Sequence, residues 1–228
     1  SPWQNARRKF MRHKSGRIGL AVVVFFLLIA VLAGVIAPVD PIMQKEGARL
    51  LPPVWQDGGT WPHLLGTDVL GRDLFARILY GAQVSLLIGI ISVSVGIFIG
   101  MPIGMISGYA GGTTDTVVMR LLDVMLAFPS VLLTVVIVAV LGPSLNNAMV
   151  AIGIVSVPQY ARVIRASVLS EREREYVTAD VAMGKKDGSI LFRAILPNVL
   201  SPILVVATLN FASAVLETAG LSFIGLGA

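Results

Sequence analysis

Long apolar runs constrain this sequence more than any other feature. Residues 18–37 carry no charged side chain, and a run of about 20 such residues is long enough to span a bilayer as an α-helix. Further apolar runs follow, mean hydropathy is +0.83, and only 14% of residues are charged. Soluble domains are about a quarter charged, so the sequence predicts an all-α, polytopic integral membrane protein.

The apolar runs define five predicted crossings. They are residues 18–37, 82–107, 124–141, 145–163 and 195–216. The net charge of +5 is concentrated in the basic segment 1–17, and no acidic residue occurs before Asp40. The positive-inside rule therefore places the N-terminus in the cytoplasm, with Trp3 and Phe10 as anchors of a surface helix. The apolar stretch of a signal peptide is about 7–15 residues, so we interpret residues 18–37 as an uncleaved crossing.

Residues 38–81 form a polar loop without an excess of basic residues, as expected on the outer side of the membrane. The loop contains a GTD-x-x-GRD motif, formed by Gly66, Thr67, Asp68, Gly71, Arg72 and Asp73. Two glycines, an Asx residue and opposite charges indicate an ordered turn that leads into a short helix from Arg72. A turn with local salt bridges is favoured over a ligand site.

Small residues recur every four positions in the second crossing, at Ser92, Gly96, Gly100, Gly104 and Gly108. This spacing predicts a face on which another helix approaches closely. Pro102 is a predicted kink in this crossing, as are Pro129 and Pro158 in the next two. Glu217 near the end of the fifth crossing is expected at the outer interface or facing a cavity. The glycine-rich C-terminal end predicts a turn or a re-entry.

The segment 171–197, which we call the handle, lies between two apolar runs and holds ten of the 31 charges. It therefore lies in water, on the same side as the N-terminus. Tyr176, Val177, Ala179, Ala182 and Met183 give an apolar stripe at helical spacing. Two short helices are predicted, the first containing the Glu171–Arg174–Glu175 face.

The two helices of the handle have predicted ends. Gly184 stops the first helix, and Asp187 or Ser189 caps the second. Such a hairpin is suited to docking a soluble partner, or to resting on the lipid surface. Both interpretations stay open.

Several chemistries find no support in the sequence. There is no cysteine and no nucleotide-binding G-x-x-x-x-G-K-[ST] motif, and the two histidines, His13 and His63, lie outside the predicted crossings. Paired carboxylates within the crossings are also missing. The sequence therefore predicts no enzyme, no catalytic or metal site and no nucleic-acid binding, but a conduit driven by another protein.

The handle resembles the EAA loop of ABC-importer permeases. Its Thr178-Ala179-Asp180, Gly184 and Leu196-Pro197 follow the spacing of that loop, although Thr178, Asp180 and Ala194 differ from the usual Glu, Ala and Ile. The wider sequence, including the GTD-x-x-GRD motif, Tyr160–Arg165 and the LSFIGLG end, resembles the C-type permease subunit of dipeptide and oligopeptide ABC importers.

This resemblance implies a type I ABC importer permease fold in a bacterial inner membrane. A sixth helix is then expected beyond residue 228, as are a few residues before Ser1. The implied partners are a B-type permease, two cytoplasmic ATPases that bind ATP and Mg, and an extracytoplasmic peptide-binding protein. This chain would bind no cofactor. The alternatives are nickel or glutathione as cargo, or a non-conducting scaffold subunit.

The resemblance also implies site residues. The ATPase contact is expected at Tyr176, Val177, Ala179, Asp180, Met183 and Gly184. Candidates for the lining of the translocation path are Ser92, Ser94, Asn210 and Ser213. The outer gate or binding-protein contact is expected at Gly66, Thr67, Asp68, Arg72 and Asp73.

Overall fold

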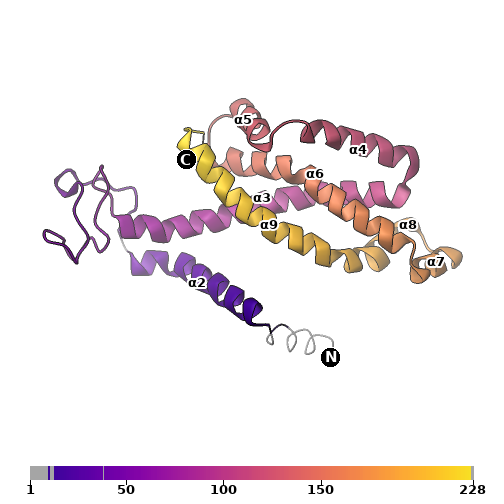
Figure 1. Cartoon of the computed structure of the whole chain (residues 1–228), viewed down its shortest axis with the longest axis horizontal. Helices are drawn as coiled ribbons and strands as arrows, with labels where there is room; N and C mark the ends of the chain where they lie inside the picture. The colour runs from indigo at the N-terminus through magenta and orange to yellow at the C-terminus, as the bar shows by residue number, and fades with distance from the viewer. Residues whose placement is uncertain (1–9, 11–12, 38, 227–228) are drawn as a thin grey trace. The chain divides into compact units, whose positions relative to one another are not determined.

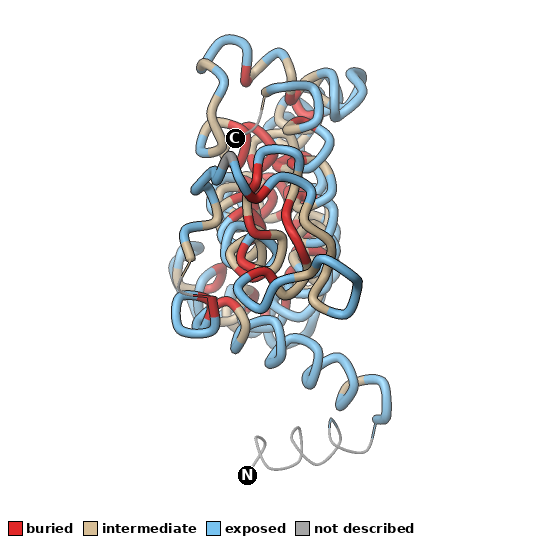
Figure 2. The backbone as a smooth tube through the Cα atoms, turned by 90° about the vertical axis from the view of Figure 1, so that its left-hand side faces the viewer, coloured by how far each residue is buried: buried red, intermediate tan, exposed pale blue. Residues whose placement is uncertain are grey.

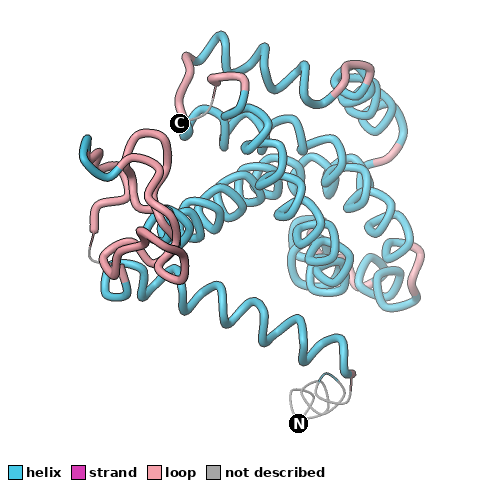
Figure 3. Tube along the Cα trace, turned by 60° about the vertical axis from the view of Figure 1, so that its left-hand side comes forward, coloured by secondary structure: helices cyan, strands magenta, loops and turns pink. Residues whose placement is uncertain are grey.

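The computed structural model describes residues 10, 13–37 and 39–226, and these form helices joined by loops (Figure 3). The expected surface helix of residues 1–17, with Trp3, lies largely outside the described residues. Within the described part, β-structure is limited to one isolated bridge between Thr67 and Asp73. The chain divides into two compact units, residues 1–86 and 87–228.

The first unit contains helix α2 (Lys14–Ile36), a loop with the short 3₁₀ helix η1 (Glu46–Ala48), and the beginning of helix α3 (Leu74–Ala110). Ala33 of α2 and Leu79 of α3 share a small buried cluster, and Gln83 Nε2 donates to the Ala30 carbonyl at 2.6 Å. Most large side chains of α2 point outward, as expected for a helix surrounded by lipid.

Helix α3 is longer than the sequence predicted. The expected short helix after Arg72 and the expected crossing 82–107 are one continuous helix that begins at Leu74 and passes through Pro102. With 37 residues it is about 55 Å long, which exceeds the roughly 30 Å of a bilayer core.

The second unit is built around helix α6 (Leu145–Arg172), which continues through Pro158 (Figure 1). The other helices are the rest of α3, α4 (Gly112–Leu126), α5 (Ser130–Leu141), α7 (Glu175–Ala182), α8 (Asp187–Ser189), the π-helix η2 (Ile190–Ile195) and α9 (Leu196–Phe223). Met149, Tyr160 and Ile164 of α6 are fully buried, and buried residues concentrate in the interior of this unit (Figure 2).

Among the residues that the structure describes, four helices are long and apolar enough to span a membrane, and a fifth span results if α4 and α5 are taken together. The predicted crossing 124–141, with its kink at Pro129, is divided between α4 and α5, and the chain bends by 89° between these two helices. Pro129 occupies the N-cap of α5 and disfavours helical backbone at Phe128. Alone, α5 has 12 residues, or about 18 Å, which is too short to cross.

The close helix contact predicted for the small-residue stripe is confirmed, and the neighbour is α6. A Cβ atom on Gly100 would lie 2.7 Å from Tyr160 Cβ, and one on Gly104 would lie 2.5 Å from the Ala161 carbonyl oxygen. In return, a Cβ on Gly153 of α6 would meet Val95 at 2.7 Å. Only glycine allows the two helices to approach this closely.

Helix α9 ends in a turn rather than a re-entry within the described residues. Gly225 adopts a φ of +79°, the amide of Leu226 donates to the Leu221 carbonyl, and that of Gly225 donates to the Ser222 carbonyl. This is the Schellman arrangement, in which glycine takes the left-handed position after the helix. Leu221 and Leu226 pack in the same apolar cluster.

Candidate functional site

The handle folds as a compact extension of α6 and α9. Helix α6 continues to Arg172, α7 begins at Glu175, and Arg174 takes the N-cap position between them. The predicted single helical face through Glu171, Arg174 and Glu175 is therefore wrong, because the helix breaks within it. Glu171 and Arg174 still approach each other, with 3.8 Å between Oε1 and Nε.

Gly184 ends α7 as the sequence predicted. Its φ is +72°, its amide donates to the Val181 carbonyl, and the Lys185 amide donates to the Asp180 carbonyl. These are the two hydrogen bonds of a Schellman motif. The Lys185 ammonium also lies 2.5 Å from Asp180 Oδ1, so the side chains reinforce the same turn.

The predicted caps of the second helix are wrong. Lys186 takes the N-cap position of α8, while Asp187 is its first residue and Ser189 its last.

Val177 turns toward the protein and not toward a partner. Its side chain is 1% exposed and packs with Ile190, Leu191 and Ile195 of the handle and with Ile164 of α6. Val177 was predicted to belong to the ATPase contact, but its burial makes it the residue that holds α7 against the handle. The apolar stripe predicted from the sequence thus contains both buried and exposed residues, which the sequence alone did not distinguish.

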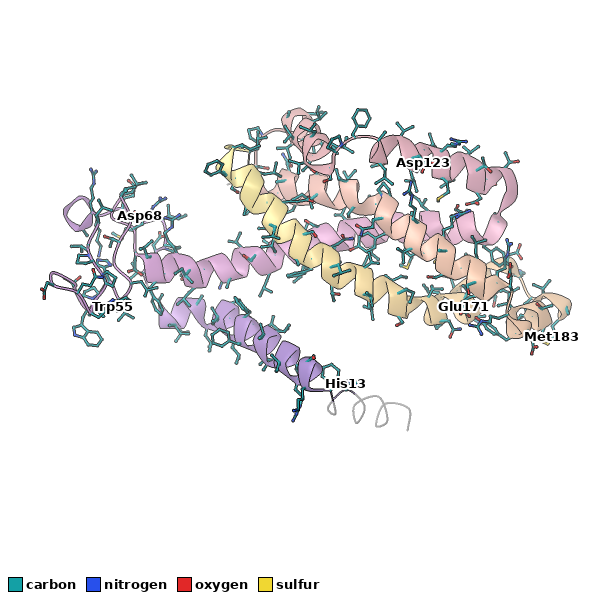
Figure 4. All side chains as sticks on the ribbon, in the orientation of Figure 1. His13, Trp55, Asp68, Asp123, Glu171 and Met183 are labelled. Carbon is teal, nitrogen blue, oxygen red and sulfur yellow. The ribbon has the colours of Figure 1, made fainter. Side chains whose placement is uncertain are left out.

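Apolar side chains in the last turn of α7 and at its end are exposed. Val181 is 55% exposed and Met183 66%, and the predicted contact residue Ala179 is exposed beside them. Met183 lies at the tip of the handle (Figure 4). Together these residues form an outward apolar surface, which we call the α7 outer face, on a helix whose inner side is fixed.

Tyr176 connects the two helices that enter and leave the handle. Its hydroxyl donates to Glu171 Oε2 at 2.6 Å and accepts from Asn198 Nδ2 at 3.1 Å. Partial burial raises the pKa of the Tyr176 phenol, and the bond to the Glu171 carboxylate raises it further. The ring therefore stays neutral while it bridges the end of α6 and the start of α9.

A polar cavity of about 240 Å³ lies among α3, α6 and α9, beside the break between α4 and α5. It is lined by Ser92, Val93, Leu126, Ser130, Ile152, Val155, Ser156, Gln159, Leu209, Asn210, Ser213, Ala214 and Glu217. Three of the four residues predicted to line the translocation path, Ser92, Asn210 and Ser213, are brought together here.

Ser94 is not part of this cavity. Ser92 is buried and donates to the Met149 carbonyl at 2.9 Å, whereas Ser94 is exposed on α3. Residues two apart do not share a helix face, which accounts for the separation. Ser156 and Gln159 were not among the residues predicted to line the path. Two polar residues three apart within the crossing 145–163 were the available signal.

Glu217 faces the cavity, which decides between its two predicted positions. It is half-buried, and it lies on the same side of α9 as Asn210 and Ser213. Asn210 Nδ2 is itself buried beside the Tyr160 hydroxyl, and neither atom has a further hydrogen-bond partner among the described residues.

The GTD-x-x-GRD motif forms a closed network within the first unit. Asp68 Oδ1 accepts from the amides of Leu70 and Arg72, and Oδ2 accepts from Arg72 Nε at 2.8 Å and Arg77 Nη1 at 2.6 Å. Partial loss of water raises the pKa of the Asp68 carboxyl, but the hydrogen bonds and charge of Arg72 outweigh this and hold it at about 2.

The other motif residues are engaged in the same loop. The Thr67 hydroxyl donates to the Ala48 carbonyl and accepts from the Leu51 amide. Asp73 accepts from the Ala76 amide at 2.7 Å, as a cap of α3, and contacts His63 Nδ1 at 3.1 Å. Gly66 has a φ of +79°, and a Cβ there would lie 2.3 Å from the Leu51 carbonyl oxygen. These contacts agree with the turn that the sequence favoured over a ligand site.

A second polar cluster joins α4 to α6. Arg165 forms a two-point ion pair with Asp115, which also accepts from the Ser107 hydroxyl. Arg162 lies 2.5 Å from Asp123 of α4, the residue that is labelled in Figure 4. These residues border an open hollow of about 450 Å³. Each acidic group beside the hollow has a basic partner, so the cluster acts as a tie between helices.

The long apolar helices, the folded handle and the polar cavity define a helical membrane protein of the permease class. Residues 100–228 match the model of a family described as the binding-protein-dependent transport system inner membrane component. Residues 1–53 match the N-terminal TM domain of oligopeptide transport permease C. Among the described residues, no group of three His, Asp or Glu side chains is arranged to hold a metal ion.

Curated relatives extend this similarity over the whole chain. The dipeptide transport system permease protein DppC of Haemophilus influenzae is 44% identical, covering 100% of this chain and 77% of that protein. DppC of Escherichia coli K12 is 46% identical over 100% and 76%. The glutathione transport system permease protein GsiD of Pectobacterium atrosepticum is 39% identical over 100% and 74%.

The fold also occurs in a solved structure. The MetNI methionine ABC transporter in an inward-facing conformation aligns with a TM-score of 0.59 and 21% identity, over 66% of this chain and 76% of that one. This chain therefore belongs to the family of binding-protein-dependent transport system inner membrane components, with the ABC importer permease fold, and within it to the C-type permeases.

Proposed function

We propose that this chain is the membrane subunit of an ATP-driven importer that moves dipeptides and oligopeptides into the cell. Relatives that are dipeptide permeases by name match over the full chain at 44–46% identity. In this proposal the chain carries no ATPase site of its own, and two partner ATPases bind ATP and Mg. A B-type permease and an extracytoplasmic peptide-binding protein complete the complex.

The α7 outer face carries the proposal. Exposed Val181 and Met183 stand on a helix whose inner residue Val177 is buried and whose end is closed at Gly184. An apolar helix face on a fixed support suits a groove on a soluble protein. We place the ATPase contact at Tyr176, Ala179, Asp180, Met183 and Gly184, to which Val181 is added. The lipid-surface hairpin is the competing role.

Through this contact, the partner ATPases would drive the conformational change of this chain. Movement of the ATPase would shift the handle, and through the buried side of α7 it would shift α6 and α9. The two conformations of the permease then differ in their affinity for the ATP-bound pair, and ATP can shift the equilibrium only by that difference. The handle and residues 1–17 accordingly lie in the cytoplasm.

The remaining parts follow this orientation. Residues 38–81 form the outer loop, and residues 82–228 form the core of the permease with the handle as its coupling loop. The polar cavity with Ser92, Asn210 and Ser213 lies on the cargo path, which the partner permease completes. The GTD-x-x-GRD loop, a rigid closed turn, supports either the binding-protein contact or the outer gate.

Disrupting the α7 outer face tests the proposal. In the complex reconstituted into vesicles, Gly184→Leu with Ala179→Arg should abolish both ATP-driven dipeptide uptake and ATPase stimulation by the loaded binding protein. Gly188→Ala is the matched control, because its Cβ would meet nothing within 4 Å and it lies outside the contact set. Normal uptake by an intact double variant contradicts the coupling role.

Competition identifies the cargo. Excess unlabelled dipeptide should suppress uptake of a labelled dipeptide, while excess glutathione or Ni²⁺ should leave it unchanged. Uptake suppressed by glutathione instead would assign the chain to the cargo named for its 39%-identical relative. An assembled complex that moves none of the three would favour a scaffold subunit.

A further inference from the structure

Glu217 is a carboxylate on a membrane-spanning helix, facing a cavity. It lines the polar cavity and is half-buried, and within the described chain no side chain forms a hydrogen bond or ion pair with it. A carboxylate at membrane depth is costly unless it faces a cavity or a cation. The ion pairs elsewhere in this unit, such as Asp123 with Arg162, show how other carboxylates here are satisfied. The Glu217 carboxylate is therefore free to pair with a cation that does not belong to this chain.

The cavity also presents a neutral amide at the other end of the same face of α9. Asn210 and Glu217 are seven residues apart, which places them on one face about 10 Å apart along the helix. Asn210 Nδ2 is buried beside the Tyr160 hydroxyl. Ser213 lies between Asn210 and Glu217, and all three residues line the cavity. The face thus offers an anionic acceptor at one end and neutral polar groups along the rest of its length.

This pattern is complementary to a short zwitterion. An extended dipeptide spans about 7 Å, with an ammonium at one end and carbonyl and carboxylate oxygens toward the other. A single carboxylate among neutral amides and hydroxyls matches one positive charge. The cavity has a volume of about 240 Å³ and is completed by the partner permease. In a space of this size the peptide ammonium lies close to the Glu217 carboxylate.

We propose that Glu217 binds the N-terminal ammonium group of the peptide in the cavity, while the rest of the peptide lies along Ser213 and Asn210. This inference rests on the proposed function and adds a residue-level preference for cargo with a free amino terminus. The cavity is open on one side, so water weakens the ion pair and the peptide can leave again.

The test uses the complete reconstituted complex with its binding protein. The probe is a dipeptide that carries a photoreactive diazirine in its first side chain, added to complexes arrested with ATP and vanadate. Light should label α9 around residues 209–218 in the unsubstituted complex. Glu217→Gln, which keeps the shape but removes the charge, should reduce this labelling at least fivefold. It should also reduce the dipeptide moved per ATP hydrolysed at least tenfold.

Two controls define the outcome. Glu217→Asp keeps the carboxylate and should retain more labelling and uptake than Glu217→Gln. Asp57→Asn removes an exposed carboxylate of the outer loop and should change neither. Assembly is checked by co-purification of all subunits.

Unchanged labelling in assembled Glu217→Gln overturns the inference. So does equal loss in Glu217→Gln and Glu217→Asp, because that would make Glu217 a structural tie to the partner permease. Failure of the unsubstituted complex to take up dipeptide with ATP would instead overturn the proposed function.

Discussion

The hydroxyl of Tyr109 donates a hydrogen bond to Oδ1 of Asp187, 2.9 Å away, and so joins the end of α3 to helix α8 of the handle. Arg172 Nη1 also donates to the Tyr109 carbonyl at 2.9 Å. The handle is therefore bound to α3 as well as to α6 and α9. A movement of the handle would reach the helix that carries the small-residue stripe through these two contacts.

Tyr109→Phe should weaken coupling more than it weakens folding. The substitution removes one partly exposed hydrogen bond, which contributes about 1 kcal/mol, and leaves the ring in place. We expect the dipeptide moved per ATP hydrolysed to fall about fivefold, since 1 kcal/mol changes an equilibrium by about that factor. Tyr80→Phe, on the same helix but outside the handle, is the control. Equal uptake ratios in both variants would show that this contact transmits nothing.

The contact between α3 and α6 should tolerate no added methyl group. Gly104→Ala would bring a Cβ to 2.5 Å from the Ala161 carbonyl oxygen and 2.9 Å from Ile164 Cβ. Because backbone atoms cannot yield as a flexible side chain does, we expect a loss of about 1–3 kcal/mol in the free energy of unfolding.

Gly81→Ala is the matched control for this substitution. It lies in the same helix, its Cβ would meet nothing within 4 Å, and the helix propensity of alanine should add up to about 1 kcal/mol. Unfolding in detergent with rising denaturant measures both variants. A Gly104→Ala protein as stable as Gly81→Ala would contradict the close packing.

The small-residue stripe shows what the sequence can establish. Its four-residue spacing predicts a close helix contact without identifying the neighbour, because the period describes one helix and the partner is a matter of tertiary packing. The same limit explains Val177 and Met183. Both belong to one apolar stripe, and only the position of α7 on η2 and α6 makes one buried and the other exposed.

The local backbone conformation was predicted correctly where a single residue type determines it. Gly184 ends α7 because its φ is positive, and glycine reaches that region without strain. Pro129 signalled a kink, but not an 89° bend, because proline fixes only its own φ and restricts its neighbour. The cavity required tertiary structure, since its polar residues come from helices far apart in the sequence.

The GTD-x-x-GRD turn should lose stability only at strongly acidic pH. The folded pKa of Asp68 is about 2, below the ordinary 3.8, so the charged carboxylate stabilises the turn above about pH 4. This stabilisation is lost as the pH falls from about 4 toward 2. Hydrogen exchange at the amides of Leu70 and Arg72, corrected for intrinsic rates, should show protection falling in this window.

Asp68→Asn provides the comparison for the pH experiment. The amide retains one acceptor but no charge for Arg72 and Arg77, so protection should be lower at pH 7 and should lack the step between pH 4 and 2. Loss of protection already near pH 6 in the unsubstituted protein would mean that Asp68 does not hold the turn.

Two valines on α7 should separate folding of the handle from docking. Val177 is 1% exposed and Val181 55%. Val177→Ala removes two buried methyl groups and leaves a cavity, so the handle should lose about 2 kcal/mol of local stability. Hydrogen exchange over residues 175–183 should then accelerate roughly 30-fold.

Val181→Ala should change exchange over the same residues little, since substitutions at exposed positions usually alter stability by less than about 0.5 kcal/mol. It should instead weaken association with the partner ATPases, measured by co-purification at rising salt and detergent, because it removes apolar area from the α7 outer face. At low temperature, where the handle of the Val177→Ala variant is folded, this variant should associate with the partner ATPases. The reverse pattern, with normal assembly of Val181→Ala and faster exchange in that variant, would mean that the exposed side of α7 supports the fold and meets no partner.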